Sequence, residues 1–188
     1  MSATPGETET KNILLIGMRG VGKSTVASAL ADLLQWTLVD SDALIERQAG
    51  LSIRDIFTQH GEAAFRAMES RIVAEICANS RQVVSLGGGA VLSPANRDTI
   101  RRAGAVIWLT AAPDVLIERM RRDIERGLVR PSLTDRDWSD EVRELTNARA
   151  PLYAEIAQIR IDTDNLTPAH IARVALKQLG LQEPPTHE

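Results

Sequence analysis

The stretch Gly17-Met18-Arg19-Gly20-Val21-Gly22-Lys23-Ser24 decides the fold of this 188-residue chain. It fits the pattern G-x-x-x-x-G-K-[ST] of a phosphate-binding P-loop. The apolar run Ile-Leu-Leu-Ile at 13–16 precedes it, and a helical pattern over 25–34 follows it. A strand, a glycine loop and a helix in this order form the structural context that a P-loop requires.

The residue types of this loop suit phosphate chemistry. Its glycines let the backbone aim N–H groups at phosphate oxygens, and the following helix directs its positive end to the same place. Lys23 has the length to reach the β- and γ-phosphates, and the Ser24 hydroxyl suits Mg²⁺. A glycine turn without a ligand is the alternative, but the context favours a nucleoside triphosphate. We expect the nucleotide to contact Gly20, Val21, Gly22, Lys23, Ser24 and Thr25.

Composition narrows the possible partners. A net charge of −3 and a pI near 5.7 argue against nucleic acid or an anionic membrane surface as a partner. The single cysteine, Cys77, excludes an internal disulfide and a cysteine-based zinc site. No apolar run approaches the length of a membrane span, and the polar N-terminal residues do not form a secretory signal. We therefore expect a cytoplasmic location.

The organisation of the chain is that of an α/β protein. Five apolar runs predict buried parallel strands, at 13–16, 37–39, 83–86, 106–109 and 159–161. Helical patterns alternate with these runs, which predicts a parallel sheet. Ser93 and Thr167 stand before prolines as helix N-caps, and Gly50, Gly104 and Gly180 occupy helix C-terminal positions. We expect one domain over 12–180, with a disordered tail at 1–11 and another tail at 181–188.

Two regions depart from simple alternation. Residues 51–78 hold two helical stretches, at 53–59 and 62–78, between two predicted strands. Residues 126–140 are charged, contain Gly127 and Pro131, and lack a core periodicity. We expect a lid over about 123–140, because lids in P-loop proteins carry arginines on segments of low local stability. The alternative is a long surface loop.

Candidate binding and catalytic residues follow the predicted strands at their carboxyl ends, where open parallel sheets bind their ligands. Asp40 and Asp42 follow the second strand; one carboxylate can serve Mg²⁺ and the other an attacking hydroxyl. Asp42 also stands where a helix N-cap would lie. The glycines Gly87, Gly88 and Gly89 follow the third strand and permit close backbone approach to a ligand, although a simple turn is possible.

Three arginines, Arg66, Arg130 and Arg149, lie outside any regular salt-bridge pattern. Guanidinium groups bind carboxylates and phosphates with two parallel hydrogen bonds, so these residues are candidates for anion recognition. Each of them could equally be a solvated surface residue, and composition does not choose between the two. The three histidines show no metal-ligand spacing.

The ordered motifs resemble those of the shikimate kinase family from Asn12 to about Leu179. The motifs are GMRGVGKST at 17–25, DSD at 40–42, IFTQHGEAAFRAME at 56–69, SLGGGAV at 85–91, RP at 130–131 and NARAPLYAEIA at 147–157. The resemblance implies a P-loop kinase fold with five parallel strands in the order 2-3-1-4-5. It also implies transfer of the γ-phosphate of ATP to the 3-hydroxyl of shikimate, with Mg²⁺ as the cofactor.

The resemblance further implies a role for each matching residue. Lys23 and Ser24 correspond to the P-loop lysine and serine, and Asp40 belongs to the Mg²⁺ sphere together with Ser24. Asp42 corresponds to the aspartate that holds the acceptor hydroxyl and acts as its base. With Lys23 and Asp42, the lid arginine Arg130 completes the implied catalytic set.

Further positions are assigned to the acceptor. Arg66 and Arg149 correspond to the pair that binds the acceptor carboxylate, with Glu69 anchoring Arg66. The backbone of the glycine loop, Gly87 to Gly89, contacts the acceptor, and Phe57 forms an apolar wall. On the nucleotide side, the implied residues are Pro168 and an arginine facing adenine, for which the sequence leaves Arg121 and Arg122 as alternatives.

The chain departs from the family pattern near the predicted lid. Ser132 replaces the first leucine of the usual Arg-Pro-Leu-Leu, and the segment 120–129 is longer than usual without the common Arg-Thr pair. Rival interpretations are another hydroxy-acid kinase such as a gluconate kinase, a nucleotide switch and a catalytically inactive binding module. The N-K-x-D and D-x-x-G signals of a switch do not occur in the sequence, and Lys23 and Asp42 are both retained. We expect a monomer.

Overall fold

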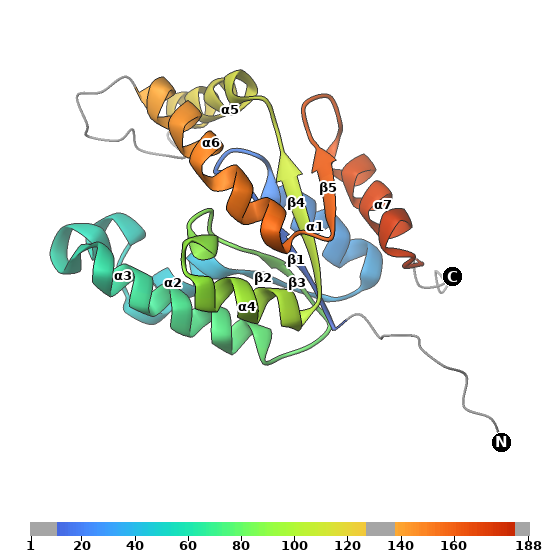
Figure 1. Cartoon of the computed structure of the whole chain (residues 1–188), viewed down its shortest axis with the longest axis horizontal. Coiled ribbons are helices and arrows are strands. Elements are labelled where there is room, and N and C mark those ends of the chain that lie inside the picture. The colour runs from blue at the N-terminus through green and yellow to red at the C-terminus, as the bar shows by residue number, and fades with distance from the viewer. Residues whose placement is uncertain (1–10, 127–137, 183–188) are drawn as a thin grey trace.

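Five parallel strands form the central sheet of the computed structural model, in the order β2-β3-β1-β4-β5 (Figure 1). This order confirms the expected topology. The strands are β1 (Asn12–Ile16), β2 (Thr37–Asp40), β3 (Gln82–Ser85), β4 (Ala105–Thr110) and β5 (Ile159–Asp162). The structure describes residues 11–126 and 138–182, so Arg130 and most of the predicted lid lie outside the described residues.

Helices cover both faces of the sheet (Figure 1). The helices α1 and α7 pack together on one face, and α3, α4 and α6 lie on the other. The elements are α1 (Lys23–Leu34), α2 (Ser41–Ala49), α3 (Ile53–Cys77), the 3₁₀ turn η1 (Ala90–Leu92), α4 (Pro94–Ala103), α5 (Pro113–Glu125), α6 (Trp138–Ile156) and α7 (Pro168–Leu179). No helix among the described residues is long and apolar enough to cross a membrane.

The sheet supplies the centre of the hydrophobic core. Every residue of β1 is buried, because β1 lies between β3 and β4 and is covered by helices on both faces. The expectation of buried strands fails at the two edges of the sheet. In β2, Thr37 and Leu38 are exposed, and β5 is only partly buried. An edge strand has a neighbour on one side only, which an apolar run in the sequence does not reveal.

The two helical stretches expected in 51–78 are parts of α3. Gly61 separates them with φ 79° and ψ 170°, a backbone conformation that favours glycine. Ser93 and Thr167 accept hydrogen bonds at the N-termini of α4 and α7, as predicted. Gly104 is the C-cap residue of α4, as predicted, but its φ of 161° is not the usual left-handed conformation. A Cβ atom there would collide with the backbone of Asn12, so close approach between chain segments requires this glycine.

The strand register brings the predicted site together. The strands are parallel, so their carboxyl ends meet at one edge, where the P-loop follows β1. In the pairing of β2 with β3, Asp40 lies opposite Ser85, and Ser85 in turn lies opposite Leu15 of β1. Residues distant in sequence therefore form one surface around the P-loop.

Candidate active site

A cavity of about 560 Å³ opens at the carboxyl ends of the strands. The P-loop, the end of β2 and the glycine loop (Gly87 to Gly89) contribute to its walls, together with residues of α3, α5 and α6. The lining residues are Arg19, Gly20, Gly22, Lys23, Ser24, Thr25, Asp40, Asp42, Ile53, Ser85, Leu86, Gly88, Gly89, Asp123 and Arg149. Most of the predicted site residues thus line one cavity. The additional members are Arg19, Ile53, Ser85, Leu86 and Asp123.

The P-loop wraps around the side chain of Lys23. Gly20 and Gly22 have φ values of 79° and 94°, which place their N–H groups in a turn that other residues rarely adopt. The Lys23 Nζ donates hydrogen bonds of 3.0 Å to the carbonyl oxygens of Gly17 and Met18. The loop therefore holds the ammonium group beside its own backbone.

The charge of Lys23 depends on its surroundings. Burial lowers the pKa of Lys23 to about 8, although the carboxylates of Asp42 and Asp40 act in the opposite direction. The amine is still mostly protonated at neutral pH. The two carboxylates thus help to keep the buried ammonium group charged, and the charged group can bind an anionic phosphate chain.

Asp40 joins the end of β2 to the P-loop. Its Oδ2 accepts a 2.8 Å hydrogen bond from the Ser24 hydroxyl, and the Ser85 hydroxyl lies 3.2 Å from the same Ser24 oxygen. Its Oδ1 accepts from the N–H groups of Asp42 and Ala43, so Asp40 is the N-cap of α2. The helix N-cap role that the sequence offered for Asp42 therefore belongs to Asp40. Three hydroxyl and carboxylate oxygens meet here, and such oxygens are the ligands that Mg²⁺ prefers.

Asp42 is a half-buried carboxyl group in the first turn of α2. The pKa of Asp42 is raised to about 6, chiefly by burial and then by the nearby Asp40 carboxylate, while Lys23 acts in the opposite direction. Gly87 lies so close that a Cβ atom there would collide with the Asp42 Oδ1. A carboxylate with a pKa near neutrality, facing a cavity, is well matched to accept a proton from a hydroxyl.

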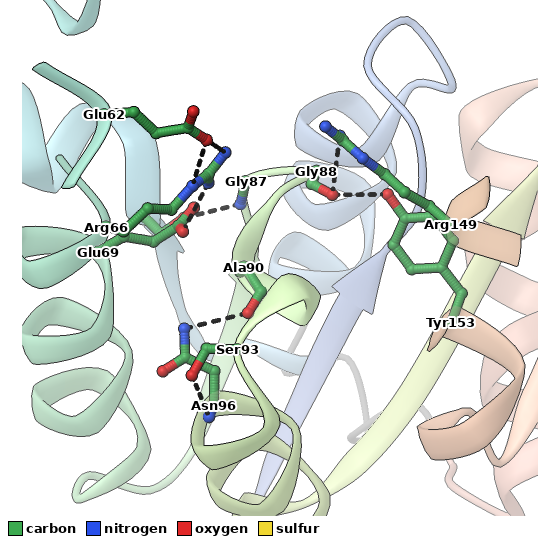
Figure 2. A network of polar contacts seen from close by, with 11 residues as sticks. Glu62, Arg66, Glu69, Gly87, Gly88, Ala90, Ser93, Asn96, Arg149 and Tyr153 are labelled. Atoms are coloured by element: carbon green, nitrogen blue, oxygen red, sulfur yellow. Dashed lines mark hydrogen bonds and ion pairs between the residues drawn. The ribbon is translucent and has the colours of Figure 1, made fainter. Parts of the chain in front are cut away.

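Arg66 approaches the glycine loop from α3 (Figure 2). Its Nη1 donates a 2.8 Å hydrogen bond to Glu69, whose side chain is only 3% exposed, and its Nε and Nη2 donate to Glu62. A Cβ atom at Gly89 would collide with the Arg66 guanidinium. Glu69 therefore anchors Arg66 as expected, and a side chain at position 89 would push the Arg66 guanidinium out of its present place.

Arg149 approaches the same loop from α6 on the opposite side (Figure 2). Its Nη1 donates a 3.2 Å hydrogen bond to the Gly88 carbonyl oxygen, whereas its buried Nε has no partner among the described residues. No carboxylate is paired with Arg149 in the described part of the chain. Because Arg149 lines the cavity and its positive charge is not compensated by a paired carboxylate there, its guanidinium is suited to bind an anion.

Other predicted residues lie away from this cavity. Phe57 is 37% exposed and packs its ring against Phe65, with 4.6 Å between the ring centroids; Ile53, one helical turn earlier, lines the cavity instead. Pro168 is an exposed residue that begins α7. Arg122 pairs with Glu118 at 2.9 Å and is 61% exposed.

A different arginine lies beside the P-loop. Arg119 donates hydrogen bonds of 2.9 and 2.7 Å to the side chain and backbone oxygens of Thr163, and one of 3.5 Å to the Val21 carbonyl. Thr163 follows β5, so Arg119 joins the loop before α7 to the P-loop. Arg121 and Arg122 both pair with Glu118 on the exposed side of α5. Arg119 and Arg122 are three residues apart, so the sequence alone would place them on similar faces of α5. The packing of α5 shows that Arg119 contacts the P-loop, whereas Arg122 pairs with Glu118.

No group of three or more histidine, cysteine, aspartate or glutamate residues suited to a metal occurs within 11–126 and 138–182. Any metal at the Ser24 and Asp40 oxygens would therefore need phosphate oxygens or water to complete its coordination. Magnesium at phosphate-transfer sites is typically bound in this way.

The fold and the cavity together define a P-loop kinase that acts on a small molecule. The shikimate kinase family model matches residues 19–180. Curated relatives are the shikimate kinases of Rhodopirellula baltica (41% identical, covering 91% of both chains) and Symbiobacterium thermophilum (45% identical, covering 81% of this chain and 87% of that one). The chain belongs to the shikimate kinase family, as the sequence motifs predict.

A solved structure also shows this likeness. The shikimate kinase from Acinetobacter baumannii in complex with shikimate has a TM-score of 0.84 and is 33% identical, with 91% of this chain and 93% of that chain covered. The likeness therefore extends over almost the whole fold rather than the P-loop alone.

Proposed function

We propose that this enzyme transfers the γ-phosphate of ATP to the 3-hydroxyl of shikimate. The observation that carries the proposal is one cavity lined by the P-loop, by Asp42 and by Arg149, an arginine without a paired carboxylate among the described residues. These groups supply a phosphate site, an acceptor for a hydroxyl proton and a cation for a carboxylate. Shikimate offers a hydroxyl and a carboxylate on one small ring. Family membership supports the same reaction.

The P-loop would bind the triphosphate of ATP. Backbone N–H groups of the loop and the Lys23 ammonium would stabilise the negative charge that develops on the transferring phosphoryl group. Mg²⁺ would be held by the Ser24 hydroxyl, with Asp40 acting directly or through water. When bound, the ion would neutralise charge on the phosphate oxygens.

Asp42 would accept the proton of the attacking hydroxyl. Its raised pKa of about 6 gives a carboxylate that is mostly ionised at neutral pH and more basic than an ordinary aspartate. Glycine at position 87 leaves room for the Asp42 Oδ1, which would collide with the Cβ atom of any other residue there.

The two arginines would bind the acceptor carboxylate unequally. Arg66 already interacts with Glu62 and Glu69, so its charge is largely compensated. Arg149 donates to the Gly88 carbonyl oxygen and has no carboxylate partner within the described residues. We therefore propose Arg149 as the principal carboxylate ligand, with Arg66 and the backbone of the glycine loop supporting it.

On the nucleotide side, we propose that Arg119 and not Arg121 or Arg122 lies next to the adenine. The support is its position between the P-loop and the loop before α7, where Pro168 follows. The lid over about 123–140 and its Arg130 stay predictions, because 127–137 are outside the described residues. We also propose that the enzyme is a monomer, because the groups that line the described cavity need no second copy to complete them.

A coupled assay of ADP release tests the reaction. Shikimate, gluconate and other hydroxy acids would each be supplied with ATP and Mg²⁺, and a reaction without acceptor would correct for ATP hydrolysis. We expect shikimate to have the highest kcat/KM by a wide margin. A preference for gluconate would support the sugar-acid kinase interpretation, and no turnover with any acceptor would support an inactive binding module.

A further inference from the structure

We propose that Tyr153 is a positioning residue that holds Arg149 and the glycine loop in register for acceptor binding. The inference rests on the proposed function, because its readout is recognition of the shikimate carboxylate. Tyr153 lies four residues after Arg149 on α6, so both side chains are on the same face of the helix. Both reach the same atom, the carbonyl oxygen of Gly88 (Figure 2).

The hydroxyl of Tyr153 makes the shorter of these two contacts. It donates to the Gly88 carbonyl at 2.7 Å, compared with 3.2 Å for the Nη1 of Arg149. The side chain is 1% exposed, so water does not compete for this bond. A carbonyl oxygen has two lone pairs, and these two donors use both of them. The phenol therefore fixes the atom to which Arg149 is bound.

Tyr153 also connects the glycine loop to the P-loop. Its hydroxyl lies 3.8 Å from the sulfur of Met18, and a Cβ atom at Gly88 would lie 3.3 Å from the Gly17 carbonyl oxygen. The Tyr153 ring packs against Trp108 of β4, with 5.8 Å between ring centroids. The phenol is thus anchored in the core while its oxygen lies where the two loops meet.

The protonation state of Tyr153 supports a role as a donor. Burial raises the pKa of Tyr153 to about 12, with the positive charge of Arg149 acting in the opposite direction. The phenol stays protonated throughout the physiological range and cannot serve as a base. Its contribution is therefore geometric, and it is expected in acceptor affinity more than in the chemical step.

The first test compares the wild type with Tyr153→Phe, which keeps the ring and removes only the hydroxyl. The Gly88 carbonyl then keeps Arg149 as its only donor, and the guanidinium moves toward it and away from the acceptor. We expect the KM for shikimate to rise about tenfold, because about 1.4 kcal/mol, the scale of one such hydrogen bond, corresponds to a factor of ten in affinity. The kcat and the KM for ATP should change by less than about threefold, within the spread of such effects.

The substrate carboxylate provides the discriminating readout. The wild type should prefer shikimate to an analogue whose carboxylate is reduced to an alcohol, and Tyr153→Phe should lose most of that preference. In an Arg149→Ala background, Tyr153→Phe should have little further effect, because the two residues act as one unit. Equal losses for acid and alcohol, or additive effects of the two substitutions, would show that Tyr153 acts only through stability.

Asn96 of α4 offers a matched control, because it supports the turn that directly follows the glycine loop. It is 4% exposed, and its Nδ2 donates a 3.0 Å hydrogen bond to the Ala90 carbonyl, beyond the glycines and away from Arg149 (Figure 2). Asn96→Leu removes this support without touching the Gly88 carbonyl. If Tyr153 acts through Arg149, Asn96→Leu keeps the preference for the acid over the alcohol. If it loses that preference equally, loosening of the loop explains both variants and the positioning role is wrong.

A second measurement needs no substitution. Tyr153 is the only tyrosine in the sequence, so biosynthetic incorporation of 3-fluorotyrosine places one ¹⁹F label at this position. We expect its resonance to shift when shikimate is added and to move much less with the alcohol analogue. An unchanged resonance with saturating shikimate would overturn the inference. A wild-type enzyme that does not phosphorylate shikimate would refute the proposed function first, which separates the two failures.

Discussion

Replacement of Asp42 by asparagine should remove activity and at the same time stabilise the protein. Burial is the largest cause of the raised pKa of Asp42, which is about 6. An unperturbed aspartate titrates near pH 3.9, and each pKa unit corresponds to about 1.36 kcal/mol. The ionised side chain therefore lowers the free energy of unfolding by about 2–3 kcal/mol at pH 7, after allowance for partial exposure to solvent. The neutral amide of the Asp42→Asn variant would carry no such charge.

The sign of the pH dependence follows from linkage. Between about pH 4 and pH 6, the folded protein holds a proton on Asp42 that the unfolded chain has released. The destabilising contribution is therefore absent below about pH 4, grows as the pH rises and is complete above pH 6. Urea unfolding should show Asp42→Asn to be more stable than the wild type at pH 7, and the difference should shrink toward zero near pH 4.

Kinetics give the other half of this prediction. Loss of the base should lower kcat by about 10²–10⁴ while the affinity for ATP changes little. In the wild type, kcat/KM for the acceptor should fall below pH 6, where the Asp42 carboxylate becomes protonated. Equal stability of the two proteins at pH 7, or normal turnover by the variant, would refute the reasoning. Collapse of ATP binding with kcat retained would assign Asp42 to the metal and make Asp40 the candidate base.

Three further predictions concern the charges around the transferred group. Lys23→Ala should lower kcat by about 10²–10³, the scale for one group that stabilises transition-state charge; steady-state kinetics with near-normal turnover would contradict the P-loop assignment. Arg149→Ala should raise the KM for shikimate more than Arg66→Ala does, because only Arg66 is paired with carboxylates in the described structure; the reverse order in initial-rate measurements would show that Arg66 is the main ligand. Arg130→Ala should lower kcat by about 10²–10³ with ADP binding retained, and calorimetric titration of ADP together with turnover assays checks both parts.

Several features of the fold could be predicted because they are encoded locally. The P-loop pattern and the apolar runs depend on neighbouring residues, so the sequence predicted a parallel sheet and the position of its binding edge. The N-caps at Ser93 and Thr167 are local for the same reason. Gly104 ends α4 as predicted, but its need for glycine comes from Asn12, a residue far away in the sequence that local patterns do not reveal.

The candidate site was predictable in its residues but not in its connections. The motifs identified Asp42, Arg66 and Arg149, and the structure brings all three to the glycine loop. Arg119 and Tyr153 were missed, because their partners lie far away in the sequence. Arg119 bonds to Thr163, 44 residues later, and Tyr153 to Gly88, 65 residues earlier. Hydrogen bonds of this kind leave no periodic signal.

The sequence by itself therefore determined the phosphate-binding loop, the alternation of strands and helices and the family. Backbone conformation and hydrophobic periodicity are properties of short segments, and side-chain chemistry is read directly. Only the tertiary structure decided which arginine is compensated and which is free, and where burial shifts the pKa of Asp42 and Lys23. Charge compensation and desolvation depend on distances between atoms from different elements, and those distances exist only once the chain has packed.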